Sequence, residues 1–277
     1  MTFRQREALD KTRRLVHEAL MVSTFARDIR ACLRFYSRLP VPPGDGGHAM
    51  PDFARVSWAA PLAGGVIGAI GAGVVLIGGF LHLPSFVVAA CAVGALTLTT
   101  GGLHEDGLAD LADGFGGGAT REQKLAIMRD SRLGAYGAVA LCVTTLLRVA
   151  AVAATFERSV LLASLAIVSA SALSRAVGLV PMMMLLPARG DGAGASAPTP
   201  SPSAMRLALI IGGAIALAPW LCGASLAQTV VAQTAAMAGA LGVSNLARRQ
   251  IGGYTGDVLG ASQQVAEIAL LIAISAG

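Results

Sequence analysis

Three aspartates stand at helical spacing near the middle of the chain. Asp106, Asp110 and Asp113 occupy positions i, i+4 and i+7, which on a helix places them along one stripe about 10 Å from end to end. Carboxylates stacked in this way repel one another, and a hard cation such as Mg²⁺ would relieve the repulsion. The spacing therefore predicts a catalytic magnesium site made by these three residues. A solvated acidic helix end is the alternative.

His104 precedes this stripe and is a candidate catalytic proton carrier, with a capping or packing role as the alternative. A glycine run and a soluble helix predicted over 120–130 follow the stripe. The basic segment Met128-Arg129-Asp130-Ser131-Arg132-Leu133-Gly134 comes next. Because arginine pairs with phosphate in a bidentate manner, Arg129 and Arg132 are predicted to bind phosphate, and Asp130 is a further substrate-binding candidate. Basic flanking of a membrane span is the alternative.

Two more polar groups complete the candidate set. Thr255 and Asp257 end a glycine-rich segment whose backbone N–H groups can approach an anion. Asp257 either caps the last helix or contacts substrate or metal. Ser174 and Arg175 stand inside an apolar block, where a charged side chain is costly and therefore indicates a functional site. Arg148 is a second arginine of this kind, without polar neighbours in the sequence.

Membrane helices must position these residues. Of the 277 residues 55% are hydrophobic and 13% are charged, against about 25% charged in a soluble domain. The apolar residues form blocks of about 20, the length that crosses about 30 Å of hydrocarbon. The composition predicts an all-α, polytopic integral membrane bundle of about seven transmembrane helices, with a range of six to eight. The predicted spans are 57–80, 84–103, 135–156, 159–187, 205–222, 224–244 and 258–276.

The distribution of lysine and arginine predicts how the bundle is oriented. Eighteen of the 21 basic residues fall in 1–56, 104–134, 188–204 and 245–257 or at Arg206. By the positive-inside rule, the N-terminus and every long polar loop face the cytoplasm, in a multi-pass protein of the bacterial inner membrane. The net charge of +5 is then explained by anchoring beside membrane lipid, and no nucleic-acid partner is predicted.

Two domains are predicted from this pattern. Residues 1–56 form a basic N-terminal cytoplasmic segment, within which apolar residues at helical spacing over 4–38 predict an amphipathic helix on the membrane surface. Residues 57–277 form a single transmembrane catalytic domain. The four cysteines are far apart and form no CxxC pair, so neither a disulfide framework nor a zinc site is predicted.

Taken in order, these motifs resemble the cobalamin-5′-phosphate synthase family, which is also called adenosylcobinamide-GDP ribazoletransferase. The resemblance begins near residue 30 and covers nearly all of the remaining chain. It is carried by Phe35-Tyr36-Ser37-Arg38-Leu39-Pro40-Val41-Pro42, His104-x-Asp106-Gly107-x-Ala109-Asp110-x-x-Asp113-Gly114, the Met128–Gly134 segment, Ser174-Arg175 and Gly253-x-Thr255-Gly256-Asp257.

The resemblance implies a transfer at phosphorus with magnesium as cofactor. A ribose hydroxyl of α-ribazole, or of its 5′-phosphate, would attack the cobinamide-linked phosphorus of adenosylcobinamide-GDP, and GMP would leave. The three aspartates would hold magnesium against the diphosphate, and Asp110 or Asp113 could also orient the attacking hydroxyl. Such a transfer needs neutralised charge and in-line positioning rather than covalent help from the protein. The oligomeric state stays open, with a homo-oligomer among the alternatives.

Two other functions are less consistent with the sequence. A CDP-alcohol phosphotransferase has the signature D-x-x-D-G-x-x-A-R followed by G-x-x-x-D-x-x-x-D. Asp110-x-x-Asp113-Gly114 fits its beginning, but Gly117-Gly118 replaces the Ala-Arg pair and the second half is missing. A transporter would carry charged residues along a path at membrane depth. This chain instead concentrates its carboxylates in the polar loops.

Overall fold

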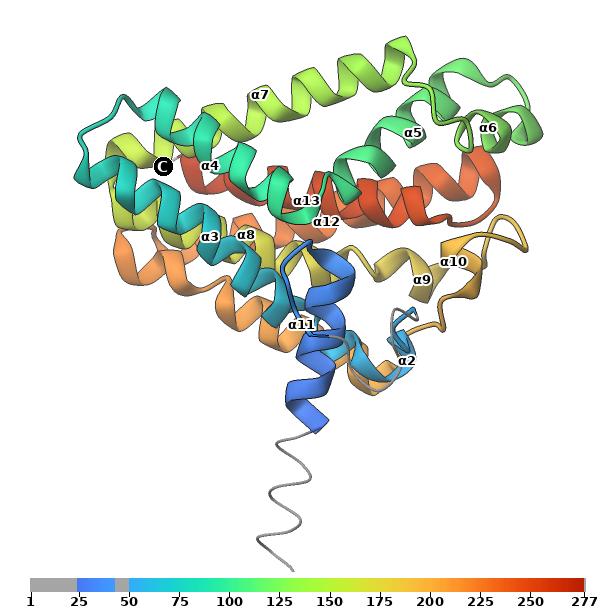
Figure 1. Cartoon of the computed structure of the whole chain (residues 1–277), viewed down its shortest axis with the longest axis horizontal. Helices are drawn as coiled ribbons and strands as arrows, with labels where there is room; N and C mark the ends of the chain where they lie inside the picture. Colours follow the sequence, from blue (N-terminus) through green and yellow to red (C-terminus); the bar gives the residue numbers. More distant parts are fainter. Residues whose placement is uncertain (1–23, 43–49, 277) are drawn as a thin grey trace, which may run out of the picture.

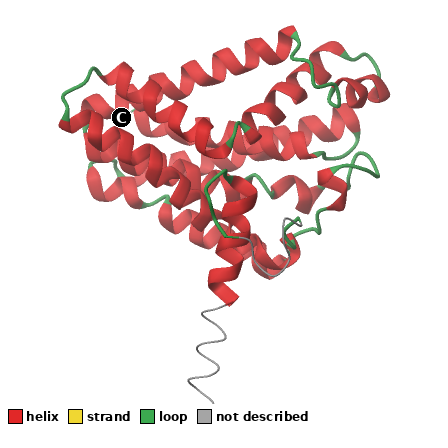
Figure 2. Ribbon diagram, in the orientation of Figure 1, coloured by secondary structure: helices red, strands yellow, loops and turns green. Residues whose placement is uncertain are grey.

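The computed structural model describes residues 24–42 and 50–276 of the chain, and within these ranges every regular element is a helix (Figures 1 and 2). The N-terminal helix covers 24–36. The others are α2 Phe53–Val56, η1 Ser57–Ala59, α3 Ala60–Phe80, α4 Ser85–Thr100, α5 Leu103–Gly117, α6 Arg121–Ile127, α7 Ala135–Arg158, α8 Val160–Val177, α9 Val180–Met184, α10 Ala193–Ser196, α11 Pro202–Ile215, η2 Ala218–Cys222, α12 Leu226–Ile251 and α13 Gly256–Ser275.

The described part of the chain has the helices of a polytopic membrane protein. Six stretches are long and apolar enough to cross a bilayer, and the bent pair α4 and α5 makes a seventh if it counts as one span. The six are Phe53–Phe80, Ala135–Arg158, Val160–Met184, Pro202–Cys222, Leu226–Ile251 and Gly256–Ser275. Six of the seven predicted spans coincide with these segments, and the seventh, 84–103, covers α4 of the bent pair, so the predicted count of six to eight is confirmed.

Small residues let the central helices touch along their backbones. A Cβ atom added to Gly64 of α3 would lie 2.2 Å from the carbonyl oxygen of Ser171 in α8, and one added to Gly68 would lie 2.8 Å from the Cα atom of Val168. Contact this close is typical of helices that associate in lipid, where packing replaces the hydrophobic effect. Helix α8, which carries Ser174 and Arg175, is therefore held firmly at the centre of the bundle.

A sharp bend separates the apolar helix α4 from the aspartate-bearing helix α5. The two axes differ by 90°, and the bend falls at Gly101 and Gly102, whose φ angles are 68° and 72°. Only glycine adopts this left-handed backbone at little cost. The bend lets the acidic helix leave the line of α4 and run toward α6 (Figure 1).

The N-terminal helix crosses the other helices rather than running along them (Figure 1). Asp28 anchors it by accepting a hydrogen bond from Trp58 Nε1 at 3.1 Å and by pairing with Arg55. Cys32 and Tyr36, farther along, are buried. The described part of the predicted amphipathic segment is therefore helical, and one of its faces packs on the protein. The part of that segment before residue 24 lies outside the described residues.

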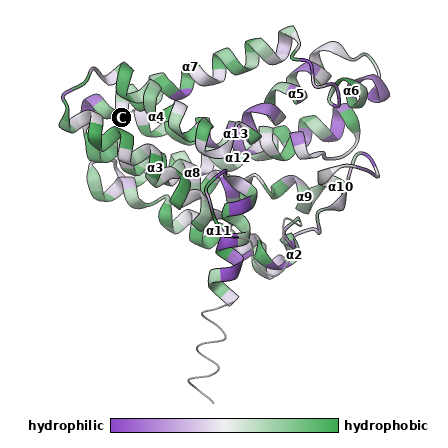
Figure 3. Ribbon diagram, in the orientation of Figure 1, coloured by the Kyte–Doolittle hydropathy of each residue, from purple (hydrophilic) through white to green (hydrophobic). Residues whose placement is uncertain are grey.

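The polar connections gather at one end of the bundle, where hydrophilic residues are concentrated around α5 and α6 (Figure 3). Arg121 of α6 joins three segments there: its Nε donates to Ile251 O and its Nη2 to Ala188 O, both at 2.7 Å. Tyr254 adds a second link, because its carbonyl accepts from Ala188 N at 2.8 Å. Three of the segments that the positive-inside rule assigned to one side, 104–134, 188–204 and 245–257, thus lie together.

Candidate active site

Helices α5 and α13 cross at two glycines, and this crossing builds the site. A Cβ atom added to Gly107 would lie 3.0 Å from the Cα atom of Asp257, and one added to Gly260 would lie 3.3 Å from the carbonyl oxygen of His104. Side chains larger than hydrogen would force the helices apart. The glycine after Asp106 therefore brings Asp106 of α5 close to Asp257 of α13.

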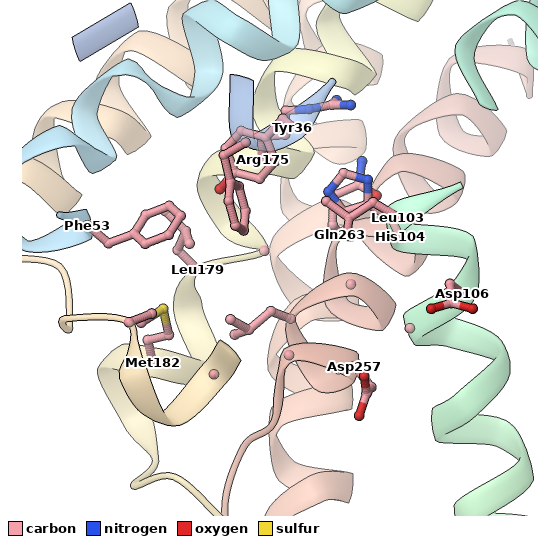
Figure 4. Close-up of a pocket in the computed structure, with 18 of the residues that line it drawn as sticks. Tyr36, Phe53, Leu103, His104, Asp106, Arg175, Leu179, Met182, Asp257 and Gln263 are labelled. Carbon is pink, nitrogen blue, oxygen red and sulfur yellow. The ribbon is translucent and has the colours of Figure 1, made fainter. Parts of the chain in front are cut away.

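A cavity of about 220 Å³ opens beside this crossing (Figure 4). Its polar wall consists of His104, Asp106, Arg175, Asp257 and Gln263. Phe53, Leu179 and Met182 form an apolar wall on another side, and Phe35 also lines the cavity (Figure 4). The structure thus brings four of the predicted site residues, from α5, α8 and α13, around one space.

Planar groups close the inner end of the cavity. The imidazole of His104 stacks on the ring of Tyr36, with centroids 5.8 Å apart and planes 18° from parallel. The guanidinium of Arg175 lies 5.8 Å from the centroid of the same Tyr36 ring. Arg175 Nη1 donates to Ser171 O at 2.7 Å, while its Nε has no partner among the residues that the structure describes. A buried, incompletely bonded guanidinium can bind a polar or anionic group that enters the cavity.

A second, more open space meets the first at Asp106. This groove measures about 670 Å³ and is lined by Arg38, Gly102, Asp110 and Ser131 among others. Phe35, Leu103 and Asp106 line both the groove and the cavity. Asp106 is thus the one carboxylate, among the described residues, that borders both spaces, as a group acting on two substrates must.

Negative charge is concentrated where the two spaces meet. The carboxylate of Asp110 is repelled by those of Asp106, Asp257 and Asp113. Arg189 offsets part of this charge: its Nη2 lies 3.8 Å from Asp257 Oδ2, and it also attracts Asp110. Sequence reasoning did not select Arg189, because it is a lone basic residue in a loop of glycine, serine and proline.

The carboxylate of Asp113 bonds to the start of α7 and does not face the two spaces. Its two carboxylate oxygens accept hydrogen bonds from Gly134 N and Gly137 N, both at 2.8 Å, and the residue is only 8% exposed. These N–H groups belong to the first turn of α7, which otherwise has no side-chain cap. Asp113 therefore caps α7 from a neighbouring helix, and it lines neither the cavity nor the groove.

No three His, Cys, Asp or Glu side chains in the described part of the chain are arranged around one metal position. Asp106 and Asp110 share the groove, and Asp257 joins Asp106 across the cavity. The magnesium site of Asp106, Asp110 and Asp113 remains a prediction, and the geometry favours Asp257 over Asp113 as a third carboxylate.

Replacing Asp113 tests its capping role. We expect Asp113→Ala to lower the free energy of unfolding by about 1–2 kcal/mol, because two N–H groups at the start of α7 lose their acceptors. Asp113→Asn retains one acceptor oxygen and should lose less. Thermal unfolding of the detergent-solubilised variants measures this. A wild-type melting temperature together with an altered magnesium requirement would instead make Asp113 a metal ligand.

The predicted phosphate-binding arginines lie in the exposed loop between α6 and α7. Arg129 pairs with Asp191, and Arg132 pairs with Asp130. The hydrogen bonds from Arg132 hold the pKa of the Asp130 carboxyl below its usual range. The structure does not bring these three residues into the cavity, although Ser131 between them lines the groove.

The last two candidates support their neighbours. Thr255, not Asp257, is the N-cap of α13: its Oγ1 accepts from Val258 N at 3.4 Å and donates to Asp257 Oδ2 at 3.0 Å. This leaves the carboxylate of Asp257 available to the cavity. Ser174 Oγ accepts from Gln263 Nε2 at 2.8 Å, so it positions a residue of the polar wall.

A buried ionic network behind the cavity is the main feature that sequence reasoning missed. Arg148 of α7 pairs with Glu105 of α5 and Glu267 of α13, each at 2.8 Å. Gln263 Nε2 also donates to Glu267 Oε2 at 2.8 Å. Charged residues inside apolar spans were the available signal, but only the fold shows that they pair with each other.

Comparison with known proteins gives one consistent result. A family model described as cobalamin-5-phosphate synthase matches residues 28–275. Proteins named adenosylcobinamide-GDP ribazoletransferase are 44% identical in Azorhizobium caulinodans, over 91% of this chain and 96% of the relative, and 46% identical in Xanthobacter autotrophicus, over 92% and 98%. One from Rhizobium etli is 40% identical, over 92% of this chain and 99% of the relative. No solved structure matches the chain.

Proposed function

Because the chain belongs to the cobalamin-5-phosphate synthase family, we propose that it transfers the cobinamide phosphate group of adenosylcobinamide-GDP to α-ribazole or its 5′-phosphate, in the synthesis of cobalamin. A ribose hydroxyl oxygen forms a bond to the cobinamide-linked phosphorus. The bond from that phosphorus to the bridging oxygen breaks, GMP leaves with the electron pair, and the hydroxyl proton passes to a carboxylate.

One observation supports this reaction most directly: two separate spaces meet at Asp106. A reaction between two large substrates needs each to be held so that the attacking oxygen and the phosphorus come together. At that junction Asp106 can orient the hydroxyl and accept its proton. Arg175, with its unpartnered Nε, can hold a phosphate or hydroxyl oxygen at the inner end of the cavity.

Magnesium is part of the proposal. The residues fit a hard cation, because Asp106, Asp110 and Asp257 supply only carboxylate oxygens and repel one another without a counter-charge. Asp106, with Asp110 or Asp257 beside it, would hold the ion together with phosphate oxygens of the substrate, because Mg²⁺ is usually bound through one or two carboxylates and substrate phosphates. When bound, magnesium would neutralise charge on the diphosphate. Arg189, whose Nη2 lies 3.8 Å from Asp257 Oδ2, would offset part of the negative charge of these carboxylates when magnesium is not bound.

We also propose that the polar end of the bundle faces the cytoplasm of the bacterial cell, in the inner membrane. That end contains α6, the segment around Ala188 and the end of α12, which Arg121 joins. The predicted inside loops carry most of the basic residues, as the positive-inside rule requires. Both substrates would then reach the site from the cytosol.

Removal of magnesium tests the reaction and the cofactor together. We expect purified protein in detergent or liposomes to release GMP from adenosylcobinamide-GDP only when α-ribazole is present. A chelator should abolish that release, and added Mg²⁺ should restore it, because the acidic site needs a cation. GMP release measured by chromatography is the readout. Full activity in excess chelator would contradict the magnesium site, and no release under any condition would contradict the transfer.

A further inference from the structure

We propose that the cavity between His104 and Met182 binds the aromatic base of the acceptor nucleoside, and that Met182 determines which bases fit. The adenosylcobinamide-GDP donor then occupies the open groove on the other side of Asp106. This inference rests on the proposed function, because it assigns the two substrates of that reaction to the two spaces that meet at the site.

Size separates the two substrates. The cavity has a volume of about 220 Å³, somewhat below the roughly 300–1,000 Å³ of sites for drug-sized ligands. A corrin macrocycle with its side chains is far larger than such ligands. The base of α-ribazole is a flat bicyclic benzimidazole with two methyl groups. The groove of about 670 Å³ is wider and more open, so part of the large donor can lie in it while the rest extends outward.

The chemistry of the walls also favours the acceptor base. Phe53, Leu179 and Met182 face the interior of the cavity from one side (Figure 4). Guanine, the other aromatic base in the reaction, carries donors and acceptors around its edge, and burying them against these side chains would leave them unpaired at a large cost. Dimethylbenzimidazole presents only methyl and C–H groups along its benzo edge, and its single hydrogen-bond acceptor, the free imidazole nitrogen, lies on the other ring.

The placement of the polar residues gives the nucleoside one orientation. Asp106 lines both the cavity and the groove, and Asp257 lines the cavity on the neighbouring helix. A base inserted toward Met182 therefore leaves its ribose hydroxyls beside these carboxylates, facing the groove. Insertion of the donor in this cavity would place the acceptor in the groove, where polar side chains such as Arg38 and Ser131 make up a larger share of the lining than in the cavity.

Met182 and its neighbour Met183 provide a test position and a matched control position. The side chain of Met182 is buried and lines the cavity, whereas Met183, next in the same helix, is 39% exposed and is not part of the lining. Met182→Trp narrows the cavity and Met182→Ala widens it. Met183→Trp makes the same chemical change outside the cavity and serves as the control.

The experiment measures kcat/KM for ribosides of unsubstituted benzimidazole, dimethylbenzimidazole and a bulkier naphthimidazole. With Met182→Trp we expect the preference for the dimethyl over the unsubstituted base to fall at least about tenfold, since pocket contacts with one or two carbons discriminate by this factor. With Met182→Ala we expect the naphthimidazole riboside to improve at least about tenfold, a gain that misfolding cannot produce. The KM for adenosylcobinamide-GDP should stay within about twofold, and Met183→Trp should change neither preference.

Two outcomes would overturn the assignment. Unchanged base preferences in both Met182 variants, or a rise in the KM for adenosylcobinamide-GDP with base preference unchanged, would show that the acceptor base lies elsewhere. A separate measurement distinguishes failure of this inference from failure of the proposed transfer. Calorimetry measures the binding of α-ribazole to the wild-type protein and to Met182→Trp in the absence of adenosylcobinamide-GDP. If Met182→Trp binds α-ribazole more weakly than the wild type does, but the wild type releases no GMP, the proposed transfer is contradicted and the base pocket is supported.

Discussion

Asp106→Asn should lower the rate of transfer at least about 100-fold, the size of effect seen when a single charge-stabilising group is removed from an active site. The amide has nearly the same shape but can neither carry a negative charge toward a cation nor accept the hydroxyl proton. Asp106 is exposed in the described structure, so this change should leave folding intact. The loss should appear mainly in kcat, because the carboxylate acts as charge develops.

The matched control is Glu122→Gln in α6. Glu122 is also an exposed carboxylate on the polar end of the protein, but it lines neither the cavity nor the groove. Its replacement should change the rate by less than about twofold, since an isolated surface charge contributes little. Equal thermal unfolding of both variants and the wild type would show that the chemistry alone is affected. A wild-type rate for Asp106→Asn would remove Asp106 from the proposed mechanism.

Hydropathy predicted the spans well because crossing a bilayer imposes a length and a composition on each helix. Each predicted span overlaps one apolar segment of the structure. The prediction could not place the bend at Gly101 and Gly102, because α4 and α5 together still look like one hydrophobic segment followed by a polar one. That bend decides where the aspartates of α5 point.

Spacing correctly indicated that the three aspartates share one helix, but not what each would meet. Positions i, i+4 and i+7 define a face of the helix, while the neighbours along that face change from turn to turn. Asp106 lines both the cavity and the groove, Asp110 lines the groove, and Asp113 is hydrogen-bonded to the first turn of α7. Capping by a residue 21 positions away leaves no local pattern in the sequence.

Other site residues depended entirely on tertiary structure. Tyr36 stacks on His104 across 68 positions of the chain, and Gln263 reaches Ser174 from another span. Arg175 could be selected from the sequence because an arginine within an apolar block needs an explanation. Its aromatic neighbour could not, since Tyr36 belongs to a segment that has the pattern of a surface helix.

The network of Glu105, Arg148 and Glu267 joins three helices at the back of the site. Arg148 is 3% exposed and lies between the two carboxylates at 2.8 Å from each. Glu105 stands between His104 and Asp106 in α5, and Glu267 is bonded to Gln263 of the cavity wall. This network therefore fixes α5 against α7 and α13 and so sets where Asp106 and His104 lie.

Arg148→Met should consequently lower the free energy of unfolding by about 3–5 kcal/mol, because removal of one partner leaves buried charge without compensation. The control is Arg158→Met, at the exposed end of the same helix, where Arg158 Nη1 donates to Ile274 O. That variant should lose less than about 1 kcal/mol. Unfolding of the reconstituted variants by heat or denaturant gives both values.

The triple variant Arg148→Met, Glu105→Gln, Glu267→Gln separates charge compensation from packing. With all three charges gone no buried ion lacks a partner, so much of the stability lost in Arg148→Met should return, as happens when a whole buried ion network is replaced by neutral groups. If the triple variant is no more stable than Arg148→Met, the arginine acts through the volume and hydrogen bonds of its side chain. If Arg148→Met alone unfolds like the wild type, the network does not hold α5 in place, and the position of Asp106 must depend on the α5–α13 glycine crossing instead.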